Sequence, residues 1–153
     1  MEIERKYLVA ALPGNIDAYP HSEIEQAYLC MSPTLRIRRM GDSYILTIKE
    51  HQPSVAGGPI VNREEEFSLS REAYEALRAK CDGGIVGKTR YRIPLDGGLT
   101  AELDIFHGRH EGLQLVEVEF PDTAAALRFV PPAWFGKDVS ADPRYRNSSL
   151  SRL

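Results

Sequence analysis

Charged and apolar residues alternate in segment after segment of this 153-residue chain, and no other feature limits its fold as strongly. Side chains two apart on a β-strand point to the same face of a sheet. The segment TLRIRRM at 34–40 therefore places Arg36 and Arg38 on one face, and Leu35 and Ile37 on the other. The recurring pattern predicts strands near 2–9, 24–30, 34–40, 43–50, 60–69, 86–94, 99–106 and 113–120.

The connections between these segments are mostly short, as hairpins require. Gly41-Asp42 joins the third and fourth predicted strands, and 96–98 joins the sixth and seventh, while the longer loop at 51–59 is rich in Gly and Pro. An open sheet leaves unpaired edges, which closure into a barrel removes. We therefore predict a mainly β (α+β) fold: one domain, residues 1–153, forming an eight-stranded antiparallel β-barrel or tunnel.

Residues with capping side chains predict three short helices outside the strands. One run with helical character follows Ser70, another follows Asp122 or Thr123, and Asp142 precedes a proline suited to a first helical turn. The first helix would end at Gly83-Gly84, and the second before Pro131-Pro132.

Composition excludes several classes of protein. The 19 basic and 22 acidic residues give a net charge of −3, which argues against general nucleic-acid binding. No apolar run approaches the ~20 residues that span a bilayer, and the N-terminus has no signal-peptide pattern. Cys30 and Cys81 form no metal-type CxxC pair. We therefore expect a cytoplasmic protein with two reduced, buried thiols.

The charges on the predicted strands are separated by sign. Two carboxylates on one strand face repel by roughly 4 kcal/mol at ~4 Å and an effective dielectric near 20, and a divalent cation between them removes that cost. Pairs of basic side chains need an anion instead, and the arginine fork matches phosphate oxygens. Around one cavity, the two kinds of pair would make a metal–polyphosphate site. The alternative is an ordinary sheet with a solvated charged face, since alternation does not tell which face is inside.

The N-terminal segment EIERK at 2–6 is similar to the ExExK signature of the CYTH family, also called triphosphate tunnel metalloenzymes. Later segments resemble the successive motifs of this family, in order and over nearly the whole chain: QAYL at 26–29, RIR at 36–38, TIK at 47–49, ExE at 64–66, KTRY at 88–91, ELDIF at 102–106, VEVEF at 116–120, PPAWFG at 131–136 and VSADPRYRN at 139–147. One short signature carries little weight, but nine in the right order make the resemblance specific.

The resemblance implies a role for each charged position. Divalent metal, Mg²⁺ or Mn²⁺ and two ions in all, would be bound by Glu2, Glu4, Glu117 and Glu119. The triphosphate would be held by Lys6, Arg36, Arg38, Lys49, Lys88, Arg90 and Arg144, the last of these on a C-terminal helix near one tunnel end. Catalysis would involve Lys6, Glu4, Glu64 and Glu66, and the further tunnel acids are Glu102 and Asp104. Parity places Glu65 outside, unless a bulge shifts the strand.

The same resemblance implies an enzyme. A single short domain of this kind most resembles the inorganic triphosphatases, so we expect hydrolysis of inorganic tripolyphosphate to pyrophosphate and phosphate. The enzyme alternatives are adenylate cyclase and thiamine or nucleoside triphosphatase activity. The alternative without catalysis is a polyphosphate- or nucleotide-binding module. The expected partner is a small triphosphate, and the oligomeric state is left open, with a homodimer as one option.

Overall fold

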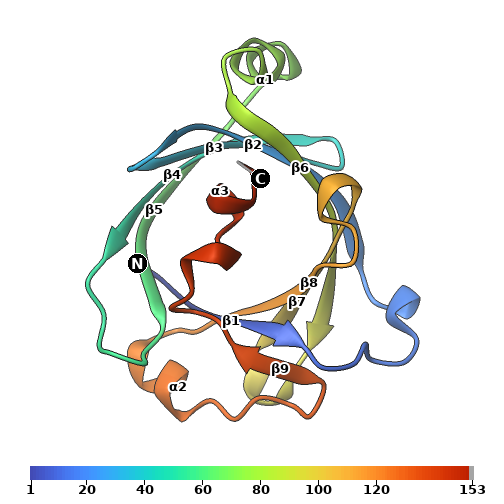
Figure 1. Cartoon of the computed structure of the whole chain (residues 1–153), viewed down its shortest axis with the longest axis vertical. Helices are drawn as coiled ribbons and strands as arrows, with labels where there is room; N and C mark the ends of the chain where they lie inside the picture. The colour runs from blue at the N-terminus through green and yellow to red at the C-terminus, as the bar shows by residue number, and fades with distance from the viewer. Residues whose placement is uncertain (152–153) are drawn as a thin grey trace.

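An antiparallel sheet that closes on itself dominates the computed structural model, which describes residues 1–151 (Figure 1). Around the barrel the strands follow the order β5-β4-β3-β2-β6-β7-β8-β1, and pairing of β1 with β5 closes the ring. The prediction of a closed eight-stranded antiparallel barrel is confirmed. The strands of the ring are β1 (Glu2–Val9), β2 (His21–Met31), β3 (Thr34–Met40), β4 (Ser43–Gln52), β5 (Ile60–Ser68), β6 (Asp82–Pro94), β7 (Thr100–Phe106) and β8 (Gln114–Glu119).

One edge of β1 is shared between two partners. Residues Glu2–Glu4 pair with Asn62–Ile60 of β5, and farther along the same strand Tyr7 and Val9 pair with a ninth strand, β9 (Phe135–Asp138). The alternation pattern missed β9, because four residues reading FGKD are too few to show a period of two. This strand continues the sheet where β5 has diverged from β1.

The strand ends differ from the prediction most clearly at β6. The sequence predicts a start near residue 86, with Gly83-Gly84 ending a helix, but the strand already begins at Asp82. Gly84 is needed there for packing, since a Cβ on it would lie 1.5 Å from Nη2 of Arg109. Gly84 therefore lets a side chain from another loop lie against the strand, and the helix ends earlier, at Arg78.

The predicted helix starts are confirmed by their caps. Ser70 Oγ accepts a hydrogen bond from the Ala73 amide before α1 (Arg71–Arg78), and Asp122 caps α2 (Thr123–Arg128) in the same way. Asp142 caps only a 3₁₀ turn, Pro143–Tyr145, and α3 (Asn147–Leu150) follows it. Further 3₁₀ turns are Ile16–Ala18, Asp96–Gly98 and Gly108–His110. No helix in the described part of the chain is long and apolar enough to cross a membrane.

The hydrophobic core lies mainly outside the barrel. The outward side chains of β7 and β8, among them the fully buried Leu103 and Val118, pack against α2 and β9. On the opposite side, Tyr74 of α1 packs against Ile37 and Ala27. Figure 1 shows α1 and α2 on opposite outer sides of the ring. The apolar strand faces therefore point away from the barrel interior, which leaves the charged faces inside.

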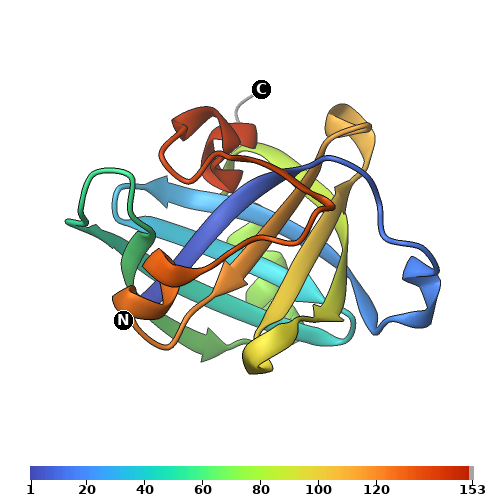
Figure 2. The same cartoon turned by 90° about the horizontal axis from the view of Figure 1, so that it is seen from below.

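The C-terminal segment covers one end of the barrel. Figures 1 and 2 show α3 over the opening of the ring and at one end of the barrel wall. The strand faces that carry charge farther along become apolar here, and Phe106 and Leu115 pack against Leu150 of α3. The predicted position of a C-terminal helix near one tunnel end is confirmed.

The outer core makes a direct prediction for stability. Leu103→Ala should lower the free energy of unfolding by about 2–5 kcal/mol, because it opens a cavity between the barrel wall and α2. The matched control, Leu127→Ala, changes a leucine of α2 that is 54% exposed, and should cost no more than about 0.5 kcal/mol. Chemical denaturation measures both. Equal losses in the two variants would contradict an outer core.

Candidate active site

The inward strand faces enclose a cavity of about 440 Å³. Every strand from β1 to β8 contributes to its lining, which is chiefly polar. Side chains of both signs meet there, so the alternative of a solvated outer face is wrong for the charged positions. The acidic residues of the lining are Glu2, Glu4, Glu64, Glu66, Glu102, Glu117 and Glu119, and the basic ones are Lys6, Arg36, Arg38, Lys49, Arg90 and Arg146.

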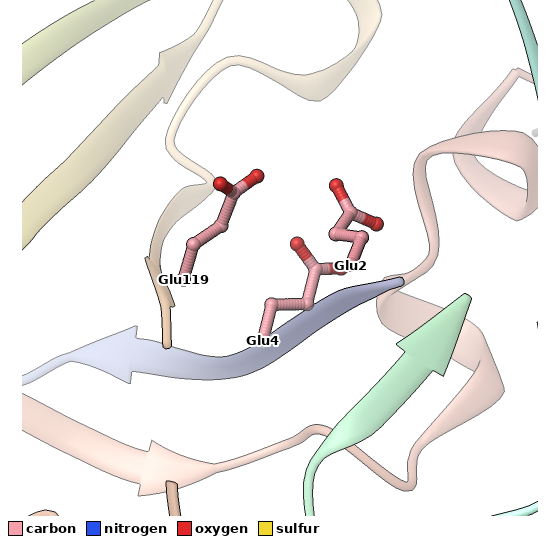
Figure 3. Close-up of side chains that lie close together, drawn as sticks. All are labelled: Glu2, Glu4 and Glu119. Carbon is pink, nitrogen blue, oxygen red and sulfur yellow. The ribbon is translucent and has the colours of Figure 1, made fainter. Parts of the chain in front are cut away.

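Three carboxylates of the lining form one cluster. Glu2 and Glu4 come from β1, and Glu119 lies directly opposite Glu4 at the end of β8. Each of the three offers an oxygen within 4.8 Å of the others, and Figure 3 shows them turned toward a shared space. The register of β1 against β8 thus brings together residues that are far apart in the sequence.

The carboxylate cluster carries unfavourable negative charge. Burial, followed by repulsion from Glu117, raises the pKa of Glu4 well above its ordinary value. Burial and the charges of Glu2 and Glu102 raise the pKa of Glu119 to about 7. Lys49 offsets part of this charge, with its Nζ 3.0 Å from Oε1 of Glu2. Carboxylate oxygens are hard ligands that suit Mg²⁺ or Mn²⁺, so the residues present fit a divalent cation.

Glu117, the fourth acid expected at the metal, has a different neighbour. Its Oε1 lies 3.4 Å from Nζ of Lys6, and neighbouring cations, Lys6 foremost, offset its burial and hold its pKa well below the ordinary value. Lys6 also donates a hydrogen bond to the carbonyl oxygen of Tyr145, at 2.9 Å. Glu117 thus lines the cavity as the counterion of Lys6, outside the cluster of three.

Two arginines of the lining lack such compensation. Arg36 and Arg38 of β3 are each 8% exposed, and in the described part of the chain their Nε atoms have no hydrogen-bond partner. Burial, together with the positive charges of Arg36 and Arg90, lowers the pKa of Arg38 to about 10. Buried cations are ordinarily paired, so this wall of the cavity favours an anion.

The acidic pair of β5, Glu64 and Glu66, lies on the face that parity predicts. Strand β4 pairs with β5 without a register shift, which places Glu64 opposite Lys49 and Glu66 opposite Thr47. Both acids line the cavity, and Glu65 is exposed outside the lining. Nζ of Lys49 lies 3.3 Å from Oε2 of Glu64 and so connects this pair to Glu2.

The two residues of β6 that were expected to bind phosphate, Lys88 and Arg90, lie in different places. Arg90 lines the cavity, and its guanidinium donates to both oxygens of Asp104 and to Glu102. Lys88 is 1% exposed, with its Nζ 2.7 Å from Asp104, and neither of these two residues is in the lining. Lys88 and Asp104 therefore form a buried ion pair outside the lining, and Asp104 accepts two hydrogen bonds from the guanidinium of Arg90.

Arg144 also lies away from the cavity. Its side chain is 76% exposed, and it pairs with Asp142 at 2.7 Å and lies over the Tyr145 ring. Arg146 enters the lining instead. Sequence reasoning also missed the uncharged members of the lining and its histidine, among them Tyr28, His51 and Asn62. Position parity on β2 is the signal that could have found Tyr28.

The two thiols also differ from expectation. Cys30 and Cys81 are free in the structure, as predicted, but both are half-buried rather than fully buried.

The carboxylate cluster predicts stabilisation by metal. Mg²⁺ or Mn²⁺ at 100 times its dissociation constant should stabilise the fold by about 2.7 kcal/mol, visible as a rise in melting temperature. Glu119→Gln should abolish most of this rise and, without metal, leave stability unchanged or higher, because it removes a repelling charge. Glu65→Gln is the matched control and should keep the full rise. Equal responses of the two variants would rule out the cluster as the cation site.

Comparison with known proteins places these residues in a wider group. The CYTH domain model matches residues 1–127. The inorganic triphosphatase of Nitrosomonas europaea is 41% identical over 155 aligned positions, covering 98% of this chain and 96% of the relative. The inorganic triphosphatase of Acetivibrio thermocellus is 33% identical and covers 97% of this chain and 92% of the relative.

Solved structures agree with this assignment. The crystal structure of the inorganic triphosphatase NE1496 superposes with a TM-score of 0.71 at 37% identity, over the whole of this chain and 95% of the other. A Hippeastrum protein, described as a putative adenylyl cyclase with a dominant triphosphatase activity, shares the fold at 17% identity and a TM-score of 0.58, over 80% of each chain. The barrel, its charged interior and these full-length relatives together establish that the chain belongs to the CYTH domain family.

Proposed function

We propose that this protein hydrolyses inorganic tripolyphosphate to pyrophosphate and phosphate, with the help of divalent metal. The observation that carries the proposal is the meeting of two unsatisfied sets in one cavity: the buried, incompletely paired guanidiniums of Arg36 and Arg38, and the crowded carboxylates of Glu2, Glu4 and Glu119. Relatives known as inorganic triphosphatases, at 33% and 41% identity, support this substrate. CYTH triphosphatases are generally metal-dependent.

The basic wall would hold the substrate by its oxygens. Phosphoryl transfer needs little covalent chemistry from a protein, so positioning and charge stabilisation dominate. Arg36 and Arg38 have free Nε donors, and Lys6 is held at a defined place by Glu117 and the Tyr145 carbonyl. Donors fixed in advance stabilise charge that develops on phosphate oxygens, without reorganising during the reaction.

The acidic wall would hold the cation. Glu2, Glu4 and Glu119 are the ligands that the geometry offers, and Lys49 already supplies one positive charge at Glu2. A divalent cation, when bound there, offsets negative charge on the phosphate oxygens. The binding of two ions, and of Mg²⁺ or Mn²⁺ in particular, stays a prediction.

We assign Glu66 as the general base that accepts a proton from the attacking water. A general base needs a carboxylate that is free to accept a proton. Glu64 is occupied by Lys49 at 3.3 Å, whereas Glu66 lines the same cavity and acts on Arg38 by its charge alone. The cytoplasmic location stays a prediction, as does the option of a homodimer.

One assay separates the alternatives. Tripolyphosphate, ATP and thiamine triphosphate are compared with Mg²⁺ or Mn²⁺, and both phosphate release and cyclic AMP are measured. We expect the highest kcat/KM with tripolyphosphate, no cyclic AMP, and no turnover with EDTA. Cyclic AMP as the main product would favour a cyclase. Tight binding with no turnover of any substrate would favour a binding module.

The basic wall makes a sharper prediction. Arg38→Ala should lower kcat/KM for tripolyphosphate by about 10²–10³, because it removes a preorganised donor to the reacting phosphates. The control is Arg39→Ala, which removes the same charge from the next residue of β3, where the side chain is exposed outside the lining. The control should keep nearly full activity. Similar rates for the two variants would show that Arg38 does not act on the substrate.

A further inference from the structure

We propose that Arg146 is a further phosphate-binding residue, carried to the cavity by the C-terminal segment. The inference rests on the proposed function and adds a ligand at the covered end of the cavity. The lining there includes Arg146, Asn147 and Ser148, together with Ser32 and Thr34 from the β2–β3 hairpin. This end is therefore built jointly from the barrel wall and from the segment that follows β9.

The segment is held in place on both sides of Arg146. Before it, the carbonyl oxygen of Tyr145 accepts the hydrogen bond from Lys6. After it, Leu150 is 4% exposed in the apolar cluster with Phe106 and Leu115, and its carbonyl oxygen bonds to Nε2 of His110 at 2.8 Å. Since these contacts involve the neighbours of Arg146, its position does not depend on its own side chain.

The guanidinium of Arg146 is free for a ligand. In the described part of the chain it has no ion pair and no side-chain hydrogen bond, and it remains exposed at the end of the cavity. Arg144, two residues earlier, has the opposite arrangement: its guanidinium is bound to Asp142 at 2.7 Å and lies outside the lining. Only one of these two arginines can therefore contact a bound anion without first breaking an ion pair.

The chemistry of tripolyphosphate suits a cation at this end. Both ends of tripolyphosphate are free terminal phosphates, which carry more negative charge than an esterified phosphate. An arginine fork can take two oxygens of such a group at once. Arg146 would thus extend the basic wall of Arg36 and Arg38 to the end of the cavity. It would add to the affinity for a polyphosphate whose free terminal phosphate lies at that end.

The two arginines supply a matched pair of variants. Arg146→Gln and Arg144→Gln remove the same charge from the same segment, so any long-range effect on an anion should be similar. We expect Arg146→Gln to raise the dissociation constant of tripolyphosphate about tenfold, and Arg144→Gln to change it less than twofold. Calorimetric titration of the folded protein with tripolyphosphate measures both, in EDTA so that the ligand is not hydrolysed during the titration. Arg146→Lys, which keeps the charge but loses the fork, should lie between.

The outcomes are distinct. Equal weakening by Arg146→Gln and Arg144→Gln would overturn the inference, as would an unchanged dissociation constant for Arg146→Gln. A wild-type protein that binds tripolyphosphate but does not hydrolyse it would defeat the proposed function, and the comparison of the two variants would still decide the role of Arg146. Melting without ligand should be nearly unchanged in both variants, because Arg146 has no side-chain partner in the described chain and the exposed ion pair of Arg144 with Asp142 contributes little to stability.

Discussion

The cost of burying charge governs the architecture of this protein. A barrel of eight strands encloses ionised side chains that an apolar interior could not accommodate, so each has to be matched by a partner or by a ligand. The apolar faces of the same strands then point outward, and they need cover of their own. Helices α1 and α2 and strand β9 supply that cover. The small elements outside the barrel are therefore a consequence of the charge inside it.

Matching of charge is complete in one part of the interior and incomplete in another. At the edge of the cavity, the buried Lys88 and the cavity-lining Arg90 share Asp104 through contacts of 2.7 to 2.9 Å. Elsewhere in the cavity, carboxylates crowd together on β1 and β8, while in the described chain the Nε atoms of Arg36 and Arg38 lack hydrogen-bond partners. The first arrangement is matched within the protein, and the second leaves charge that ligands would match. On the proposed function, this difference would separate residues that orient the site from residues that contact what it binds.

Alternation along the chain predicts strands, their faces and the sign of charge on each, because a period of two is a local property of the backbone. It therefore correctly places Glu64 and Glu65 on opposite faces, and the family resemblance indicates which of the two faces lies inside. It does not predict depth along a face, which is why Lys88 and Arg90 are equivalent in sequence and different in space. Nor does it predict which carboxylates meet, since that depends on the register of β1 against β8. Outside regular strands parity has no meaning, and there only the family resemblance pointed to a residue, Arg144, which lies outside the lining.

The way in which β1 divides its edge has a consequence for motion. Only three residue pairs in the described chain, Glu2 to Glu4 against β5, join the two ends of the ring. Two of those three residues also supply carboxylates to the cluster of Glu2, Glu4 and Glu119. The seam of the barrel and the proposed metal site are thus the same short stretch of backbone. A local opening that separates β1 from β5 would dismantle the cluster, and by mass action a bound cation would oppose that opening. A bound ion would then hold the barrel closed. Occupancy of the site by the cation and local separation of β1 from β5 would be two measures of one equilibrium.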